Sequence, residues 1–212
     1  MAHKVKTQSL PATPAPPTQK MTYEEFLAWA DEDTWAEWVD GEVILLSPVS
    51  NKHQDLAGFL AALLRLFAEA HQAGTVIIAP FQMKTAADLP GREPDIIFIA
   101  REHIDRLQDV YMDGPADLVV EIISPDSRTR DRRRKFGEYQ RGGVREYWLL
   151  DPLRKRAEFH HRGDDGLYRQ IPIGDDGILH SAVLEGLWLR VAWLWQKPLP
   201  LLMDVLREWG LI

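Results

Sequence analysis

Two acidic residues lie in segments that otherwise have the pattern of buried strands. Asp95 stands near the start of the apolar run 94–100, and Glu121 lies inside the apolar run 117–123. Short, β-branched runs of this kind predict buried strands. An ionised carboxylate in a protein core is costly unless it is paired, protonated or bound to a metal. Two such strands can place their acids side by side, and a pair of carboxylate ligands suits Mg²⁺ or Mn²⁺.

The position of Glu121 within its predicted strand indicates how it is presented. Alternate residues of a strand share a face, so Glu121 shares its face with Val119 and Ile123. Ser124 and Pro125 end this strand, which places Glu121 close to an opening. Either acid alone is explained by capping of nearby amides or by an arginine partner. Both acids together, in a mostly parallel sheet with a basic helix beside them, favour a functional site.

A lysine is the next candidate. Lys135 follows Glu121 by fourteen residues, on a predicted helix whose apolar side includes Phe136 and Tyr139. From that side its ammonium can reach the carboxylates and neutralise charge that develops on a phosphate. The alternative is a simple pair with Asp131, which is worth only about 0.3 kcal/mol. Helix geometry is equally compatible with both interpretations.

Glu37 and His53 are weaker candidates. Glu37 lies in a predicted strand beside Trp38, and it is either a fourth site residue or the cross-strand partner of a surface cation. His53 lies near the start of the longest predicted helix, where a lone histidine is usually a helix N-terminal residue, so we treat it as peripheral. The other histidines do not show the spacing of a zinc site.

A cluster of basic residues precedes and includes the candidate lysine. It comprises Arg128, Arg130, Arg132, Arg133, Arg134 and Lys135, interrupted by Asp131. Runs of this kind are usually solvated helix faces. Because the cluster is close to the acids, Arg128, Arg132 and Arg133 are candidates for contacts with nucleic-acid phosphates. The net charge of −7 argues against a protein coated in nucleic acid, so the attraction should be local.

Composition is that of a soluble globular protein. The 212 residues, 45% of them hydrophobic and 27% charged, suffice for one domain with a sizeable core. The chain has no cysteine, which excludes disulfides and thiolate metal sites and is compatible with a cytoplasmic location. No apolar run reaches membrane-spanning length, and the N-terminus lacks the apolar segment of a signal peptide. We therefore expect no membrane association.

The order of the predicted elements indicates an α/β fold. Residues 1–20 form a flexible, proline-rich tail, and residues 21–212 form the domain. Helices are predicted at about 22–30, 50–71, 101–107, 127–141 and 199–209, and strands at about 37–39, 43–46, 76–79, 81–85, 94–100, 117–123, 146–150, 157–161 and 168–173. The strand–helix–strand unit within 117–150 predicts a right-handed crossover between parallel strands. The result is a single domain with a mixed, twisted sheet and flanking helices.

Local signals support parts of this outline. Thr22 with Glu25 predicts a capping box, and Asp40-Gly41 predicts a tight hairpin turn. The segment Leu187–Trp195 contains three tryptophans, which predicts either core or a subunit interface. The chain has no phosphate-binding glycine-rich loop, no Gly-x-Ser-x-Gly elbow and no His-Glu-x-x-His motif, which disfavours the corresponding enzyme classes.

Several motifs together are similar to those of a known family. They are Glu37-x-x-Asp40-Gly41-Glu42, Pro94-Asp95, Asp117-Leu-Val-Val-Glu121-Ile-Ile-Ser124-Pro125, Lys135, Tyr139 and Gly143-Val-x-Glu146-Tyr147-Trp148. This set resembles the bacterial Uma-type endonuclease family, within the PD-(D/E)XK restriction-endonuclease-like superfamily. The resemblance covers roughly residues 21–195, and the run 117–151 is its most specific part.

The resemblance implies a restriction-endonuclease-like core and metal-dependent hydrolysis of phosphodiester bonds. Carried over, Asp95 and Glu121 are ligands of Mg²⁺ or Mn²⁺, and Glu37 matches the family's early acidic position. The superfamily lysine normally lies two residues after the glutamate, where this chain has Ile123. In this family the lysine is displaced onto the following helix, where Lys135 matches it. The implied catalytic residues are Asp95, Glu121, Lys135 and Glu37.

Three functions are compatible with these observations. The leading hypothesis is a Mg²⁺-dependent endonuclease that acts on nucleic acid, with DNA as the first choice. The second is a binding module that keeps the nuclease fold with weak or no chemistry, which the acidic net charge and the displaced lysine favour. The third is a structural subunit whose tryptophan-rich C-terminal part builds an oligomer. A homodimer is expected because C₂ dimers are the commonest assembly, with Leu187–Trp195 as the candidate interface.

Overall fold

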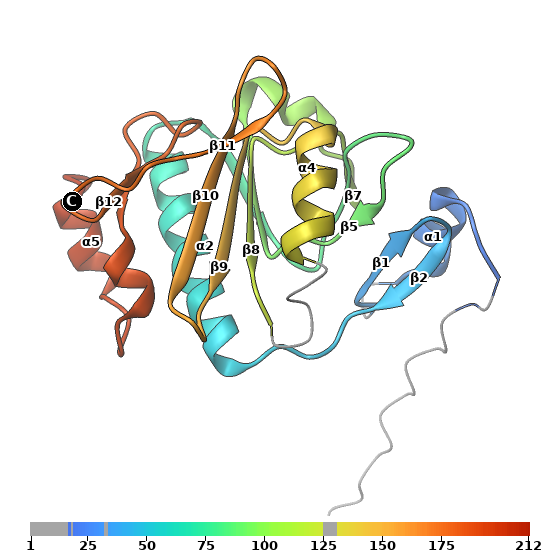
Figure 1. The fold of residues 1–212 in the computed structure, drawn as a ribbon, viewed down its shortest axis with the longest axis horizontal. Coiled ribbons are helices and arrows are strands. Elements are labelled where there is room, and N and C mark those ends of the chain that lie inside the picture. The colour runs from blue at the N-terminus through green and yellow to red at the C-terminus, as the bar shows by residue number, and fades with distance from the viewer. Residues whose placement is uncertain (1–16, 18, 32–33, 125–130) are drawn as a thin grey trace, which may run out of the picture.

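The secondary structure is arranged around two larger β-sheets, with a separate two-stranded sheet near the C-terminus (Figure 1). This computed structural model describes residues 17, 19–31, 34–124 and 131–212. The helices are α1 (Tyr23–Trp29), α2 (Asn51–Ala70), α4 (Phe136–Gly142) and α5 (Leu202–Glu208), with shorter helical turns η1 (Arg101–Arg106), η2 (Asp131–Lys135) and η3 (Val191–Trp195). The strands are β1 (Ala36–Val39), β2 (Glu42–Leu45), β3 (Gly74–Ile78), β4 (Gln82–Lys84), β5 (Gly91–Arg92), β6 (Ile96–Ala100), β7 (Tyr111–Asp113), β8 (Leu118–Ile122), β9 (Glu146–Asp151), β10 (Arg156–Arg162), β11 (Tyr168–Gln170), β12 (Ile178–His180) and β13 (Trp188–Arg190).

The larger sheet has six strands in the order β11-β10-β9-β8-β6-β3. Strands β8 and β9 are parallel, as the crossover pattern predicts, and Glu121 lies opposite Leu149 in their register. The expectation of a mostly parallel sheet is wrong, because the other four pairings of these six strands are antiparallel. Antiparallel neighbours need no crossover helix, so η1 and a short excursion suffice to connect β6 to β8. The sheet is mixed, as expected.

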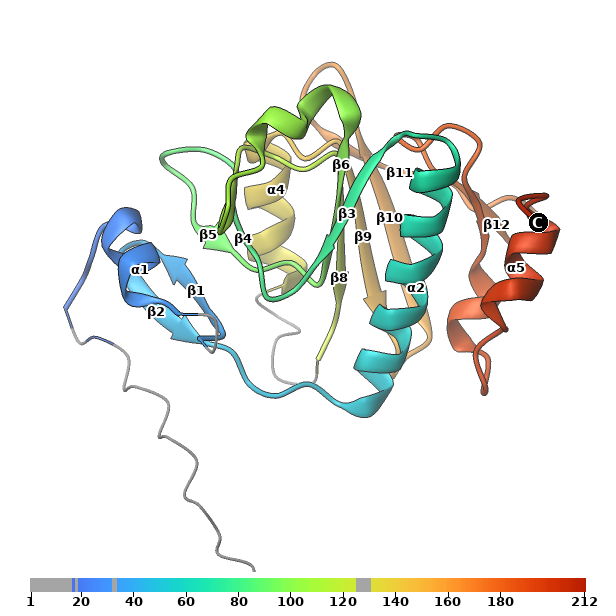
Figure 2. The ribbon, with the colours of Figure 1, turned by 180° about the vertical axis from the view of Figure 1, so that it is seen from behind.

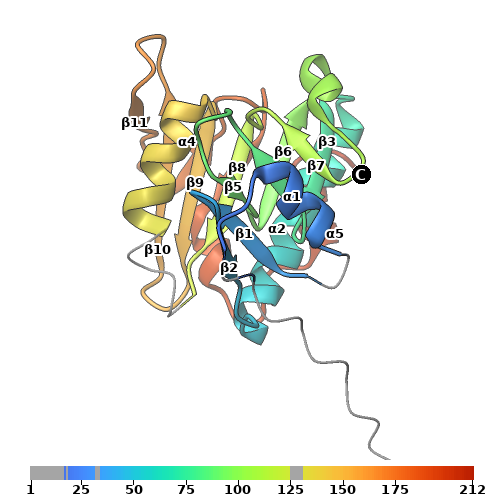
Figure 3. The ribbon, with the colours of Figure 1, turned by 90° about the vertical axis from the view of Figure 1, so that its right-hand side faces the viewer.

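Helices cover both faces of this sheet. Helix α4 lies in front of the sheet in Figure 1, α2 lies in front in the reverse view of Figure 2, and Figure 3 shows them on opposite sides. The α2 side buries Val120 and Ile122, whereas the α4 side buries Val119, Ile123 and Tyr139. Glu121 therefore lies on the α4 side of β8, on the face that its sequence position predicts.

The smaller sheet has five strands in the order β2-β1-β5-β4-β7 and was not predicted as a separate sheet. Its hairpin turns at Asp40 and Gly41, which both have the positive φ that a tight two-residue turn requires (53° and 88°). Helix α1 begins at the predicted capping box of Thr22 and Glu25 and packs on this sheet through Phe26. The segment predicted as strand 81–85 is β4, which belongs to this sheet and not to the one that contains β3.

The chain passes between the two sheets several times, and two of these connections lie side by side. It leaves the larger sheet after β3, through Ala79 and Pro80, and returns to it after β5, through Glu93, Pro94 and Asp95. The two crossings are bonded together, since the amide of Ala79 donates to the Asp95 carbonyl at 3.1 Å. The short segment that ends in Asp95 is therefore held at the junction of the sheets.

The C-terminal part packs on α2. Trp193 is buried among the residues of the α2 core, and Trp188 lies 5.5 Å from it, measured between ring centroids. Of the two interpretations of Leu187–Trp195, the structure therefore shows core, and the segment gives no separate support for a dimer interface. Helix α5 starts at Leu202, later than the predicted start near residue 199. Across the described residues, none of the helices is both long and apolar enough to span a bilayer.

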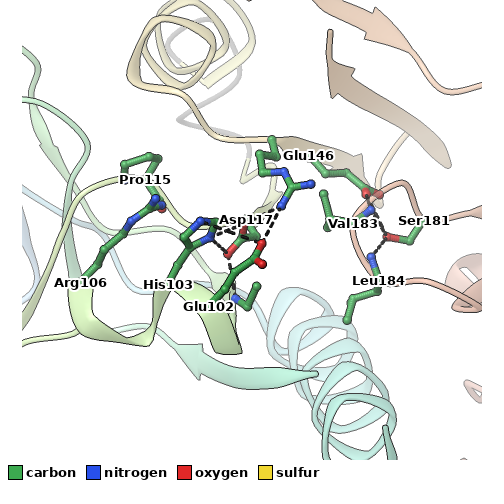
Figure 4. Close-up of polar contacts among 11 residues, drawn as sticks. Glu102, His103, Arg106, Pro115, Asp117, Glu146, Ser181, Val183 and Leu184 are labelled. Atoms are coloured by element: carbon green, nitrogen blue, oxygen red, sulfur yellow. Dashed lines mark hydrogen bonds and ion pairs between the residues drawn. The ribbon is translucent and has the colours of Figure 1, made fainter. Parts of the chain in front are cut away.

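A buried acid fastens this C-terminal part to β9. Glu146 is fully buried and accepts hydrogen bonds from the Ser181 hydroxyl at 2.8 Å and from the amides of Ala182 and Val183 at 2.7 and 2.9 Å. Figure 4 shows this contact beside Asp117, the residue that precedes β8. Both acids are saturated by donors within the protein, and their role is structural.

Candidate active site

A pocket of about 110 Å³ opens where the two sheets meet. Its lining includes Glu37 from β1, Asp95 from the segment before β6, Glu121 from β8 and Lys135 from the last position of η2. The structure thus brings the four predicted catalytic residues to one place. Glu93 and His53, which the sequence did not single out as site residues, line the same pocket.

Asp95 is held from both sides and remains accessible. Its Oδ2 accepts a hydrogen bond from the amide of Ile122 at 2.6 Å, which ties it to the residue after Glu121. Its Oδ1 lies 3.2 Å from Nε2 of His53, a buried residue in the first turn of α2. The Asp95 side chain keeps 19% of its surface exposed, whereas that of Glu121 keeps only 6%. The Asp95 carboxylate is therefore oriented but open to a ligand.

Glu121 is held by two donors from the segment that follows β8. The Lys135 ammonium lies 2.8 Å from Glu121 Oε1, and the Tyr139 hydroxyl donates to the same oxygen at 2.6 Å. Burial, followed by the negative charge of Glu121, raises the pKa of Tyr139 well above its usual value of 10.0. Tyr139 therefore stays protonated and acts as a hydrogen-bond donor.

Lys135 also contacts Glu37, which connects the pocket to a buried ionic network. Its Nζ lies 3.0 Å from Glu37 Oε1, and Arg92 donates to Glu37 Oε2 at 2.8 Å. Arg92 also makes two 2.8 Å hydrogen bonds to the two oxygens of Glu138 on α4. Burial acts to raise the pKa of Glu37, but Lys135 and Arg92 together hold it below its usual value of 4.5. Glu37 is therefore ionised at neutral pH.

Glu93 is the least satisfied acid of the pocket. It is only 6% exposed, and its Oε2 has no hydrogen-bond partner among the described residues. Burial, and then the negative charge of Glu37, raise the pKa of Glu93 to about 8. The pocket lining thus contains the acids Glu37, Glu93, Asp95 and Glu121 but Lys135 as its one strong base within the described residues. An excess of carboxyl groups over cations favours the binding of a further cation.

The residues present fit a divalent ion, although they do not enclose one. Within the described part of the chain, no three His, Asp or Glu side chains form a ready metal cage. Mg²⁺ does not require one, because it is usually held by one or two carboxylates together with water and substrate phosphates. Asp95, which directly precedes β6, and Glu121, on the neighbouring strand β8, supply two hard oxygen donors, and Glu93 lines the same pocket.

The predicted phosphate-binding arginines lie largely outside the described structure. Arg128 falls in the segment 125–130, and the side chain of Arg132 is likewise outside the described part. Arg133 is exposed in η2, two residues before Lys135. The predicted helix 127–141 is described from residue 131 onward, and residues Asp131–Lys135 form a π-helical turn. Contacts of these arginines with phosphates remain predictions.

Several residues of the site were missed by sequence reasoning. Arg92 and Glu93 directly precede Pro94-Asp95, and two charged residues beside a predicted buried strand are the signal that was available. Tyr139 was assigned to the apolar side of its helix and to the family motifs without a role, whereas its hydroxyl bonds Glu121. His53 was treated as peripheral, yet its ring faces Asp95. These contacts depend on tertiary structure, and no local spacing encodes them.

The chain matches the model of one protein family over most of its length. Residues 23–192 match the model of the Uma2 family, whose description is "Putative restriction endonuclease". The chain belongs to the Uma2 family. The match includes Glu37, Asp95, Glu121 and Lys135, so the whole pocket lies within the family region.

The chain is also similar to two individual proteins and to one solved structure. Two uncharacterized proteins of Synechocystis sp. are similar: slr1290 is 24% identical over 157 residues, covering 73% of this chain and 80% of that protein, and sll1609 is 27% identical over 152 residues, covering 70% and 84%. The crystal structure of a putative nuclease belonging to DUF820 from Anabaena variabilis superimposes with a TM-score of 0.67 at 16% identity, over 82% of this chain and 97% of that one. At that identity the match shows the fold, which is α/β with mixed sheets and flanking helices.

Proposed function

We propose that this Uma2 chain is a divalent-metal-dependent endonuclease that hydrolyses phosphodiester bonds, with DNA as its substrate. The observation that carries the proposal is the convergence of Asp95 and Glu121 in one pocket, with Lys135 2.8 Å from Glu121. The proposal is supported by the family description, "Putative restriction endonuclease", and by the structural neighbour, which is described as "a putative nuclease". In this proposal Asp95 and Glu121 hold Mg²⁺ or Mn²⁺, and Glu93 supports them.

The residues around the two acids have separate tasks in this proposal. A bound divalent ion would polarise the scissile phosphate and acidify a water molecule. Lys135 supplies fixed positive charge where negative charge develops on the phosphate, in a buried place where that charge is weakly screened. Tyr139 and His53 keep the two carboxylates in place. Glu37 and Arg92 hold the lysine and the smaller sheet against α4.

The basic segment would guide the substrate. Arg133 is exposed two residues before Lys135, and we propose that it contacts the phosphate backbone together with Arg128 and Arg132. Each lost phosphate contact should reduce the slope of log affinity against log salt by about one unit. If the slope is unchanged in an Arg132→Gln/Arg133→Gln variant, these two arginines do not contact the phosphates.

Cleavage assays test the main proposal. Purified protein is incubated with duplex DNA, single-stranded DNA and RNA in Mg²⁺, in Mn²⁺ and with a chelator. We expect metal-dependent cleavage that Asp95→Asn and Glu121→Gln abolish while the matched control Asp105→Asn, an exposed acid on η1, retains it. Equal cleavage by all variants would identify a contaminant, and no cleavage under any condition would refute the enzymatic proposal.

A binding module without chemistry is the second candidate. It is favoured by the incomplete metal cage among the described residues and by the lysine that already neutralises Glu121. Calorimetric titration with Mn²⁺ separates the two functions. Metal binding that is lost in both Asp95→Ala and Glu121→Ala supports the catalytic centre, whereas nucleic-acid binding without any metal binding supports the module.

Assembly and location complete the proposal. We propose a homodimer in the cytoplasm, on the general grounds that C₂ dimers are the commonest assembly and that a chain without cysteines suits a reducing compartment. Sedimentation at micromolar concentration tests the first part, and a monomer there would contradict it. We further propose that residues 21–212 act as one domain.

A further inference from the structure

The pocket has two walls of opposite character. One wall carries the ionic groups described above, Asp95, Glu121 and Lys135 among them. The other wall, which we name the apolar lip, consists of Trp35, Leu45, Leu46 and Val49. These residues come from the open end of the β1–β2 hairpin and from the segment that leads to α2. The hairpin aligns them, since Ala36 pairs with Leu45 and the Leu46 amide donates to the Trp35 carbonyl at 2.9 Å.

The apolar lip is partly exposed to solvent. Trp35 is 36% exposed and Leu45 is 39% exposed, although both have large apolar side chains. The other aromatic residues of the hairpin region stack on one another, as Tyr23 does on Phe26 and Trp38. The Trp35 indole makes no such ring contact with the described residues. An exposed tryptophan on the rim of a polar pocket is a surface that a ligand can cover.

We infer that the apolar lip stacks an unpaired base next to the scissile phosphate, so that the preferred substrate is a single-stranded or locally unpaired nucleic acid. This inference rests on the proposed function and specifies its substrate class. A nucleotide has the same two-sided character as the pocket, with an ionic phosphate and an apolar base face. In a duplex the base faces are covered by their neighbours, and only an unstacked base can present a face to Trp35 while its phosphate meets the ionic wall.

The expected loss of affinity can be estimated from the contribution of base–aromatic stacking to binding. Base–aromatic stacking contributes about 1–3 kcal/mol per base, which corresponds to about 5- to 150-fold in affinity. It tolerates any sequence, because every base has a π-face. The acidic net charge leaves little general attraction for duplex backbone. Stacking should therefore account for a large share of the binding energy, and single strands should bind more tightly than duplexes of the same sequence.

The test compares four variants at the lip and a control elsewhere. Binding of labelled single-stranded DNA, single-stranded RNA and duplex DNA is measured by fluorescence anisotropy in Ca²⁺, and cleavage in Mg²⁺ is measured in parallel. Trp35→Ala and Trp35→Leu remove the aromatic face, the second while it keeps an apolar side chain, and Trp35→Phe keeps a smaller face. Leu45→Ala probes the rest of the lip. Leu153→Ala, at an exposed apolar residue in the β9–β10 turn, is the matched control.

The expected result is a loss of about 5-fold or more in single-strand affinity for Trp35→Ala and Trp35→Leu, a smaller loss for Trp35→Phe, and less than about 2-fold change for duplex. Leu153→Ala should match the wild type, and thermal melting should show that all variants fold. Equal losses for single strands and duplex, or no loss, would overturn the inference. A Trp35→Ala variant that dissociates a dimer with unchanged single-strand affinity would also overturn it, because the lip would then bind a second copy of the chain.

The same data separate this inference from the proposed function. If the wild type cleaves nucleic acid and Trp35→Ala cleaves single strands and duplex as the wild type does, the nuclease stands and the stacking role is refuted. If the wild type neither binds nor cleaves any probe, both fail together. Preference between DNA and RNA is read from the two single-stranded probes, since stacking alone does not distinguish them.

Discussion

The two ends of strand β8 carry an acid each, and the protein treats them in opposite ways. Asp117 precedes the strand and Glu121 lies near its other end, on the same face. Asp117 is fully buried and accepts hydrogen bonds from the Ala100 amide at 2.7 Å and from His103 at 2.9 Å, with Arg145 at 3.3 Å (Figure 4). Glu121 is held by Lys135 and Tyr139 and faces a pocket with other carboxyl groups.

The difference shows how burial alone fails to identify a functional acid. Both residues are charged groups in strand surroundings, and both have good partners. The donors at Asp117 include a backbone amide, and its cationic partner Arg145 reaches in from the surface. The cation at Glu121 is itself buried and shared with a second acid, beside a carboxyl oxygen of Glu93 that lacks a partner among the described residues. An acid whose neighbourhood holds more carboxyl groups than cations is a candidate for function.

The largest effect is expected when each acid is replaced by its amide, which removes the negative charge and keeps the shape of the side chain. Glu121→Gln should reduce cleavage by about 10²–10³-fold or more, the effect of removing one group that acts on transition-state charge. Asp117→Asn should leave kcat within a few-fold of the wild type. Single-turnover cleavage in Mg²⁺ measures both. Similar losses in the two variants would mean that the contrast between the two ends is one of stability only.

The second largest effect is expected when the buried ammonium of Lys135 is removed. Lys135→Met leaves Glu37 and Glu121 without their shared cation, and removal of one partner from a buried pair costs about 3–5 kcal/mol. A divalent ion at the site would offset part of this loss. We therefore expect urea unfolding to show a larger stabilisation by Mn²⁺ in Lys135→Met than in the wild type. Arg145→Met, which removes the half-exposed cation beside Asp117, should show no such dependence on the ion.

A smaller effect, on the free energy of unfolding, is expected at Asp117, the residue that precedes β8. Asp117→Ala leaves the Ala100 amide and the His103 ring without their acceptor, which should lower the free energy of unfolding by about 1–3 kcal/mol. The readout is the midpoint of urea unfolding, with activity measured at low urea as the control. A variant of wild-type stability would show that solvent replaces these bonds.

The smallest effect is a pH dependence at Glu37. Its pKa in the folded chain lies below the usual 4.5, so the ionised form stabilises the fold above about that pH, and this stability is lost as pH falls through the folded pKa. Glu37→Gln should therefore be less stable than the wild type at neutral pH, and the gap should shrink as pH falls below 4.5. Thermal melting across the neutral and acidic range gives the comparison. A difference in stability that does not change with pH would show that the substitution acts through packing and not through the charge of Glu37.

Much of the fold is encoded by local signals. The capping box at Thr22, the Asp40-Gly41 turn and the long apolar stripe of α2 each act over a few residues, and each element is found where its signal predicts. The strand–helix–strand pattern 117–150 also predicts the parallel pair β8–β9. The smaller sheet was not predicted as a separate sheet, because its strands β5 and β7 have only two and three residues, too few to show periodicity.

The candidate site was predictable in its acids and not in their partners. Asp95 and Glu121 are conspicuous because their neighbours in the sequence are apolar. The bond between Arg92 and Glu37 joins positions 55 residues apart, and the bond between Tyr139 and Glu121 requires α4 to dock in one orientation. The prediction of a mostly parallel sheet was wrong for a related reason, since strand direction depends on connections that no local pattern specifies.

The order of these ionic residues along the chain determines at which stage of folding the pocket forms. Glu37, Arg92 and Asp95 are synthesised early, whereas Lys135 and Glu138 emerge only after more than half of the chain is complete. Contacts between such distant positions form late in folding, because closing long loops is entropically costly. A nascent or partly unfolded chain therefore has Glu37 and Glu121 without the lysine that they share, and the pocket is complete only once η2 and α4 have docked onto the sheet.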